Sequence, residues 1–115
     1  MKRIVWITVC LALSTSLWAG LNEDLFEAVK KGDQKKVAAL IKKGVDVNVK
    51  GKYGSTPLHF AAKRGRIKVM KLLMQNGANV NFKNYRSKTP LDLAKADKMK
   101  KLIRQAGGKS GKDIK

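Results

Sequence analysis

The chain has 115 residues and a formal charge of +18, because 26 lysine and arginine residues outnumber eight aspartate and glutamate residues. This length allows one small domain and excludes two independent hydrophobic cores. Apolar residues make up 43% of the sequence and recur in periodic patterns, which excludes a wholly disordered chain. The charge is unevenly spread, since ten basic residues and no acidic one lie between Val47 and Leu91. This balance favours an acidic or polyanionic partner.

The first twenty residues have the layout of a secretory signal peptide. Lys2 and Arg3 form a short basic start, a mostly apolar stretch runs from Ile4 to Leu13, and small residues precede Gly20. The apolar stretch is shorter than the roughly 20 residues that span a bilayer. We expect residues 1–19 to be removed on export and the protein to be periplasmic or secreted. An uncleaved anchor or a helix of the folded domain are the alternatives.

Removal of residues 1–19 would change the chemistry that the chain can offer. The single cysteine, Cys10, and both tryptophans, Trp6 and Trp18, lie in that segment. The mature chain would therefore have no disulfide, no thiolate metal site and no cysteine nucleophile. An exported domain of this kind must be stabilised by regular packing.

A period of 33 residues organises the rest of the chain. The tripeptide at Thr56 to Leu58 (Thr-Pro-Leu) recurs at Thr89 to Leu91. The same shift relates Leu25 to the leucines of both tripeptides, Gly44 to Gly77, and Asn48 to Asn81. Repetition at one fixed offset is typical of stacked structural repeats.

Two stretches of the central repeat identify the kind of repeat. Residues 54–62 read Gly-Ser-Thr-Pro-Leu-His-Phe-Ala-Ala, and residues 72–81 read Leu-Leu-Met-Gln-Asn-Gly-Ala-Asn-Val-Asn. They resemble the signature and the ending of the ankyrin repeat family. The resemblance implies an all-α solenoid of about three helix–turn–helix repeats joined by hairpin loops. The repeat domain would cover residues 20–107, with repeats at about 21–50, 51–83 and 84–107.

Local signals place the helices of the central repeat. Thr56 is suited to an N-cap and Pro57 to the first helical position, which predicts a helix over about 57–64 with Gly65 as a left-handed stop. A second apolar helix is expected over about 66–76, ended by Gly77. A polar, turn-rich loop then leads to the next repeat.

The outer repeats depart from this pattern. In the first, Asn22, Glu23 and Asp24 are expected to cap a helix start before Leu25. In the third, Thr89 and Asp92 predict a capping box. About three residues are missing between Ala94 and Leu102, so we expect its second helix to be shortened to about 98–105. Residues 108–115 form a basic tail with little to bury, which predicts disorder.

The sequence offers no catalytic constellation. Its only histidine is His59, and the resemblance implies that its imidazole is structural and hydrogen-bonds the loop and the helix start. Carboxylates are few, and no phosphate-binding glycine loop follows a strand. Met70 and Met74 have the spacing of core residues on an apolar helix. We therefore expect no enzymatic activity, no cofactor and no metal site.

A binding face can be placed by register. Phe60, Lys63 and Arg64 lie at i, i+3 and i+4 on the first helix of the central repeat, away from its alanine side. The 33-residue shift brings Glu27 and Leu93 to the same face as Phe60. In ankyrin stacks this face and the hairpin tips line a concave surface where protein partners usually dock. The expected partner-binding residues are therefore Lys52, Tyr53, Phe60, Lys63, Arg64, Tyr85 and Arg86.

Two classes of function remain open. The first is a monomeric, non-enzymatic interaction module that docks an acidic protein partner through the concave face. The alternative is binding of polyanions through the lysine-rich surface, with lipopolysaccharide or anionic lipid headgroups as ligands. Nucleic acid is expected only if the protein reaches a host cell, because base-specific readout favours arginine and a groove-fitting element.

Overall fold

The computed structural model describes residues 20–112, and the predicted signal peptide lies outside this range. A first helix covers residues 20–31 and pairs with α2 (Gln34–Lys42). The central repeat pairs α3 (Pro57–Arg64) with α4 (Ile67–Gln75), and the third pairs α5 (Pro90–Leu93) with α6 (Asp97–Gln105). Residues 20–112 contain no strand, so the predicted all-α solenoid is confirmed.

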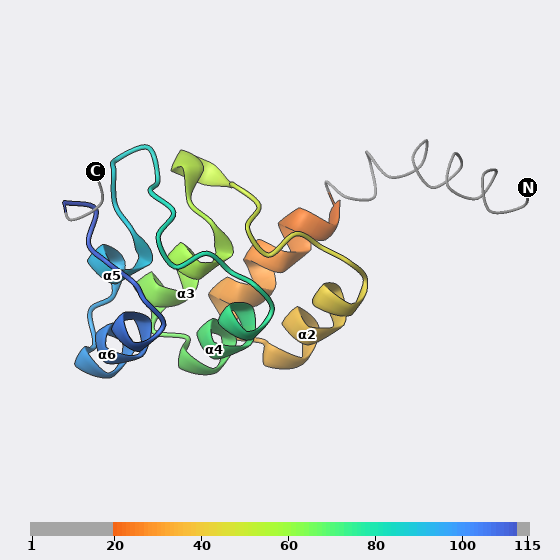
Figure 1. Cartoon of the computed structure of the whole chain (residues 1–115). Coiled ribbons are helices and arrows are strands. Elements are labelled where there is room, and N and C mark those ends of the chain that lie inside the picture. The colour runs from red at the N-terminus through yellow and green to blue at the C-terminus, as the bar shows by residue number, and fades with distance from the viewer. Residues whose placement is uncertain (1–19, 113–115) are drawn as a thin grey trace, which may run out of the picture.

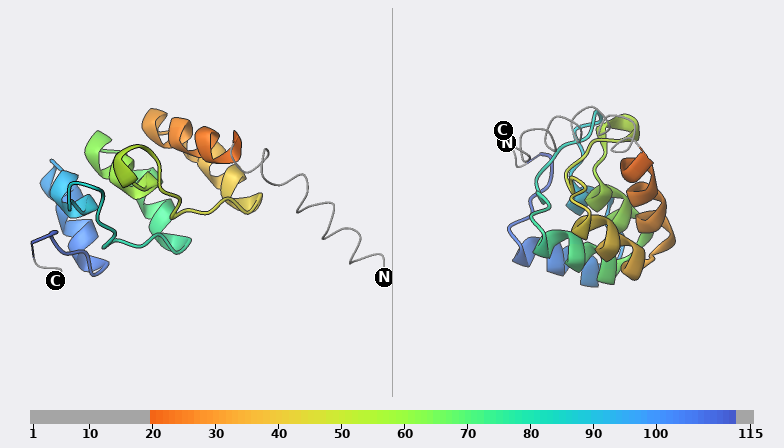
Figure 2. Two further views of the ribbon diagram at one scale, coloured as in Figure 1. Left: turned by 90° about the horizontal axis from the view of Figure 1, so that it is seen from above. Right: turned by 90° about the vertical axis from the view of Figure 1, so that its right-hand side faces the viewer.

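The three helix pairs stack side by side in two rows (Figure 1). The helices α2, α4 and α6 form one row, and the first helix, α3 and α5 form the other. The connecting loops project away from the helices on one side, as the end-on view of Figure 2 shows. Contacts between α3 and α5, and between α2 and α4, join each repeat to the next.

One apolar core runs through the stack. The leucines that the 33-residue period relates, Leu25, Leu58 and Leu91, are all buried. Met70 is fully buried and Met74 packs against the core, as the spacing predicted. Isolated helices of this length are not stable in water, so the core that the repeats share stabilises the stack.

The ends of the central helices follow their sequence signals. Thr56 and His59 form a capping box at the start of α3, with Pro57 in the first turn. Gly65 ends α3 with φ 72°, and Gly77 follows α4 with φ 90°. In this left-handed region a β-branched side chain is strained, so glycine is the suitable residue.

The start of the first helix differs from the prediction. Asn22, Glu23 and Asp24 were expected to cap it, but residues 20 and 21 are already helical. These three residues therefore lie within the helix, and the cap prediction was wrong. Leu21 packs against the core, which extends the apolar face of this helix one turn further.

The shortening of the third repeat falls on the other helix than expected. The α6 helix has nine residues, as do α2 and α4, whereas α5 has only four against eight in α3. The chain turns extended at Ala94, with ψ 129°, where the central repeat continues as a helix. The predicted bounds of the second helix, about 98–105, agree with α6 to within one residue, but this helix is not shortened, because the missing residues are taken from the end of α5. Met99 and Ile103 keep α6 anchored in the core.

Residues 108–112 also differ from the expected disordered tail. The backbone N–H of Lys109 donates to Asn81 Oδ1 at 2.9 Å, and the N–H of Gly111 donates to Asp92 Oδ2 at 2.7 Å. The hydroxyl of Thr89 donates to Lys109 O at 2.6 Å. These bonds hold residues 108–111 against the third repeat, where they occupy the place of an inter-repeat loop.

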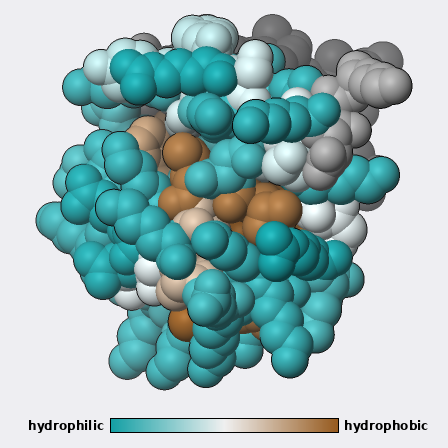
Figure 3. All heavy atoms as spheres, turned by 90° about the vertical axis from the view of Figure 1, so that its left-hand side faces the viewer, coloured by the Kyte–Doolittle hydropathy of each residue, from teal (hydrophilic) through white to brown (hydrophobic). Residues whose placement is uncertain are grey.

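The end of the stack formed by α5 and α6 has apolar side chains at its centre and hydrophilic ones around them (Figure 3). A hollow of about 250 Å³ lies beside α5, with Leu91 and Ala94 in its lining and Lys100 and Arg104 at its side. The described residues provide no further repeat at this end of the stack. Charged side chains of α6 lie beside the apolar centre there, as expected for a terminal repeat.

Candidate functional site

Two hairpin tips project from the stack and touch each other. Gly51 N donates to Ser55 O at 2.8 Å in the first, and Asn84 N donates to Lys88 O at 2.9 Å in the second. The two bonds are related by the 33-residue shift, so each loop is closed in the same way. Tyr85 N donates to Tyr53 O at 2.8 Å and joins the tips directly.

The tips contain two non-glycine residues in the left-handed region. Tyr53 and Ser87 each have φ 60°. Ser87 stands where the period would place the glycine of the preceding loop, Gly54, whose φ is 68°. A left-handed conformation costs a non-glycine residue about 1 kcal/mol or more. The loops therefore maintain a strained backbone where their side chains are presented.

His59 fixes the second loop to the start of α3. Its Nδ1 accepts the backbone N–H of Thr56 at 3.0 Å, so the ring proton lies on Nε2, which donates to Lys88 O at 2.9 Å. Burial lowers the pKa of His59 below its usual range, although the carbonyl of Lys88 and the charge of Asp92 act in the opposite direction. The imidazole is thus neutral and structural at neutral pH, in agreement with the sequence prediction.

Asp92 takes the place of this histidine in the third repeat. Burial acts to raise its pKa, but the N–H groups of Thr89 and Gly111, with the Thr89 hydroxyl, bring the pKa below its usual range. The carboxylate accepts from Thr89 N at 3.0 Å, which completes the predicted capping box. The Asp92 carboxylate is therefore used to cap α5 and to bind the backbone N–H of Gly111 near the chain end.

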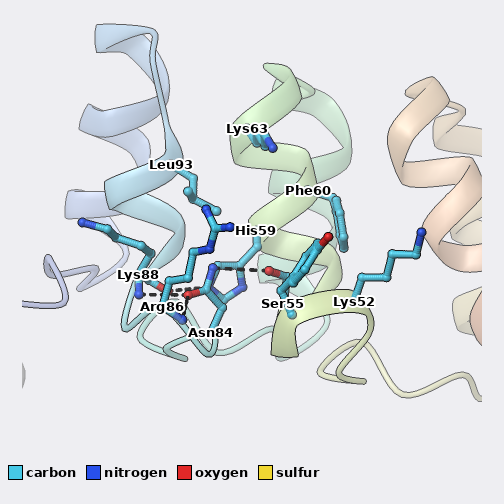
Figure 4. Close-up of a pocket in the computed structure, with 10 residues that line it drawn as sticks. Lys52, Ser55, His59, Phe60, Lys63, Asn84, Arg86, Lys88 and Leu93 are labelled. Carbon is cyan, nitrogen blue, oxygen red and sulfur yellow. Dashed lines mark hydrogen bonds between the residues drawn. The ribbon is translucent and has the colours of Figure 1, made fainter.

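A hollow of about 460 Å³ lies between the two tips and the exposed side of α3. We call it the basic hollow, since it contains four cationic side chains and no carboxylate in its lining. Figure 4 shows Arg86 reaching toward Leu93 on one side of His59, with Phe60 on the other and Lys63 further along α3. The guanidinium of Arg86 lies 5.8 Å from the centre of the Tyr53 ring, at cation–π distance. The lining residues are Lys52, Tyr53, Ser55, His59, Phe60, Lys63, Asn84, Arg86, Lys88 and Leu93.

A second hollow of about 480 Å³ adjoins the first, and it contains both acidic and basic side chains. We call it the mixed hollow. Phe26 meets Phe60 edge to face, with ring centres 5.4 Å apart, and Lys30 Nζ lies 5.1 Å from the centre of the Phe60 ring. Its lining residues are Asn22, Glu23, Phe26, Glu27, Lys30, Val49, Lys50, Gly51, Lys52 and Phe60.

The structure brings together five of the seven sequence-predicted site residues. Lys52, Tyr53, Phe60, Lys63 and Arg86 all line the basic hollow. Tyr53 is 66% exposed, whereas Phe60 is half-buried, because Phe26 packs against its ring.

The other two predicted residues lie outside both hollows. Tyr85 is 78% exposed on its tip and leans over Gly54, where an added Cβ would lie 2.6 Å from its ring. Arg64 is exposed at the end of α3. One further residue along a helix turns the side chain by about 100°, and Arg64, unlike Lys63, does not line the basic hollow.

Sequence reasoning missed several lining residues. Lys88, Asn84 and Phe26 were not selected, although the period could have found two of them. Phe26 stands at the position of His59 in the first repeat, and Lys88 at that of Ser55. Leu93 was placed on the correct face by register but was not selected as a site residue.

The chemistry of the basic hollow is suited to contact with another molecule. Among residues 20–112, no group of three or more histidine, aspartate, glutamate or cysteine side chains could hold a metal ion. In the same part of the chain, no helix has the length and apolar character needed to cross a bilayer. The basic hollow offers cations, aromatic rings and hydrogen-bond donors, which are the groups that recognise an acidic surface.

Comparison with known proteins identifies the repeat. A family model for ankyrin repeats matches residues 25–111 in three copies. A search of curated proteins finds no match. Ankyrin repeats generally mediate protein–protein interactions, and proteins built from them are typically non-enzymatic.

Proposed function

The chain belongs to the ankyrin repeat family, and we propose that it is an exported interaction module that docks an acidic protein partner through the basic hollow. The observation that carries this proposal is the composition of that hollow. Lys52, Lys63, Arg86 and Lys88 line it, and no aspartate or glutamate side chain does. A cationic surface of this kind attracts and orients a negatively charged partner.

The apolar part of the hollow supports a protein partner rather than a simple anion. Phe60 and Leu93 form part of its wall, and the exposed Tyr53 ring lies at cation–π distance from the guanidinium of Arg86. Tyrosine and arginine are enriched among residues that contribute most to binding energy in protein interfaces. An acidic rim around an apolar side chain would complement this arrangement.

Export is part of the proposal and rests on residues 1–19. A basic start, an apolar stretch and small residues before Gly20 support translocation and cleavage. The partner would then be a periplasmic or secreted protein.

The alternative, binding of polyanions such as lipopolysaccharide or anionic lipid headgroups, is favoured by the formal charge of +18. The two functions differ in where the charge matters. Diffuse attraction depends on the number of cations, whereas docking depends on those that line the basic hollow.

A photo-crosslinking amino acid at Tyr53 tests the docking site in cells of the source organism. It should capture one protein, and the same amino acid at Lys42, an exposed residue of α2, should not. Capture of the same proteins from both positions would refute docking at the hollow.

Charge reversal then separates the two functions on the captured partner. The double variant Lys63→Glu with Arg86→Glu should slow association and flatten its salt dependence. Lys42→Glu with Lys43→Glu is the matched control, because it makes the same charge change on the other row of helices. If both double variants weaken binding equally, diffuse polyanion attraction is the better account.

A further inference from the structure

We propose that the two hollows together bind one extended segment of the protein partner in a fixed orientation. The acidic side chains of the segment would occupy the basic hollow, an apolar side chain would lie over Phe60, and a basic side chain would lie beside Glu23 and Glu27. This inference rests on the proposed function and adds to it the polarity of the bound segment.

The two hollows form one continuous surface. Lys52 and Phe60 line both of them, so the hollows adjoin along these two side chains. Their volumes of about 460 and 480 Å³ each suit a few side chains of a bound segment. A segment that follows this surface crosses from the second and third repeats to the first.

The two ends of this surface carry different charge. The basic hollow has cations from the first tip, α3 and the second tip, and no lining carboxylate. The mixed hollow includes Glu23 and Glu27, which lie one turn apart on the first helix. A segment with its own charge separation therefore binds more favourably with its acidic end in the basic hollow and its basic end beside these carboxylates than in the reverse orientation.

Two lysines of the mixed hollow are placed over aromatic rings. Lys30 Nζ lies 5.1 Å from the Phe60 ring centre, and Lys50 Nζ lies 5.6 Å from that of Phe82. Both ammonium groups are at cation–π distance. Both lysines keep their positive charge, and the carboxylates of Glu23 and Glu27 are the feature that distinguishes this end from the basic hollow.

Between the charged ends lies an aromatic platform. Phe26 and Phe60 pack at an interplanar angle of 78°, and Phe60 is half-buried beneath the shared boundary of the hollows. An edge-to-face pair presents both a ring face and a ring edge to a third apolar group. The surface therefore runs from a hollow lined by cations and no carboxylate, over the aromatic rings, to a hollow in which two carboxylates lie among lysines. The segment that suits this order is acidic, apolar and basic, with its basic side chain beside Glu23 and Glu27.

Two synthetic peptides test this orientation. The dipolar peptide has aspartates at one end, leucine and phenylalanine in the middle and lysines at the other end; in the all-acidic peptide the lysines are replaced by aspartates. A nitroxide label is attached to either end of the dipolar peptide, and amide signals of the isotope-labelled protein are recorded by NMR. A label at the acidic end should broaden the amides of residues 84–88, and a label at the basic end those of residues 23–27.

A charge variant tests the anionic end. Glu27→Lys should weaken binding of the dipolar peptide by about three- to tenfold, since it replaces an attraction with a repulsion at an exposed site. It should leave binding of the all-acidic peptide unchanged or stronger. Asp24→Lys is the matched control, because Asp24 is exposed on the same helix and lines neither hollow. Its effect on the dipolar peptide should be less than about twofold, as expected for a charge screened by salt.

The outcomes separate this inference from the proposed function. If both labels broaden residues 84–88 alike and the Glu27 and Asp24 variants bind alike, the orientation is refuted while docking at the basic hollow stands. If neither peptide perturbs residues 52–63 or 84–88, both proposals fail. Signal changes spread evenly over the lysines of all three repeats would overturn the oriented segment in favour of diffuse polyanion attraction.

Discussion

Replacement of His59 should weaken the stack more than any single change in the loops. The side chain is 1% exposed, and its two ring nitrogens join the start of α3 to the second hairpin tip. His59→Ala removes the hydrogen bonds of both ring nitrogens and leaves a cavity in the core. His59→Leu fills most of that volume and removes only the hydrogen bonds.

The magnitude follows from the groups that are left behind. The N–H of Thr56 loses its acceptor at a residue that is 1% exposed, and an unsatisfied buried donor costs about 1–3 kcal/mol. The carbonyl oxygen of Lys88 still accepts a hydrogen bond from Asn84 N at 2.9 Å. Loss of its bond to His59 therefore costs less free energy than loss of the acceptor of Thr56 N. We expect His59→Leu to lower the free energy of unfolding by about 2 kcal/mol. His59→Ala should lower it by about 3 kcal/mol or more, because the cavity adds its own cost.

Urea denaturation followed by circular dichroism measures both values. Small domains have a total stability of about 5–15 kcal/mol, so losses of this size shift the midpoint clearly. If His59→Leu is as stable as the parent protein, the hydrogen bonds of His59 do not stabilise the fold and the reasoning is refuted.

The pH dependence of stability provides a second readout. Burial lowers the pKa of His59 in the folded protein, so the unfolded chain binds a proton first as the pH falls. The contribution of the neutral imidazole should be complete above the unfolded pKa of about 6.5 and should be lost as the pH falls through the lower folded pKa. His59→Leu should lack this dependence. Asp92, whose pKa is also lowered, stabilises the fold above the unfolded pKa of about 4, and this contribution is lost below it.

Three further substitutions test the backbone and the chain end by urea denaturation. Gly77→Val should lower the free energy of unfolding by at least about 1 kcal/mol through strain alone, because φ is 90° and an added Cβ meets nothing within 4 Å. Ser87→Gly should raise it by about 0.5 kcal/mol, since relief of the positive φ outweighs the entropy of the new glycine. Asn81→Ala should lower it by about 1 kcal/mol and speed hydrogen exchange of the Lys109 amide, which now donates to Asn81 Oδ1. Retained protection of that amide would show that the chain end is held by other contacts.

The helices of the central repeat could be predicted because their signals are local. Thr56, Pro57 and Gly65 each act on the backbone next to them, and α3 has the predicted bounds. The first helix was less predictable. Polar residues suited to a cap lie inside it, because the helix already includes Leu21, which packs against the core.

In the third repeat, the 33-residue period could not predict which helix is shortened. The spacing between Ala94 and Leu102 indicated that residues are missing but not which helix is shortened. The structure shortens α5, because α6 must keep Met99 and Ile103 one turn apart in the core. The chain after Gly107 was expected to have little to bury. This segment is held by the side chains of Asn81 and Asp92, which are distant in sequence. They form hydrogen bonds with backbone groups of residues 107, 109 and 111.

The position of the candidate site could be predicted from the sequence, but the burial of its side chains could not. Register alone identified the face that Lys63 and Phe60 share with the loop tips. It could not show that Phe26 packs against Phe60 and half-buries it, because that contact joins two repeats. Nor could register show that Lys63 lines the hollow and Arg64 does not. The two side chains differ in direction by one helical residue, and the effect of this difference depends on where the neighbouring tip lies.

Stability and the proposed binding site are coupled through one residue, Lys88. Its side chain lines the basic hollow, and its backbone carbonyl oxygen accepts a hydrogen bond from His59 Nε2–H. The second tip also contains the strained Ser87 and depends on fixed contacts to retain its shape. Loss of His59 therefore removes a restraint on Arg86 and Lys88 even in molecules that remain folded. A partner would then have to order this loop on binding, at a cost of conformational entropy, so the capping of α3 and the shape of the basic hollow are parts of one arrangement.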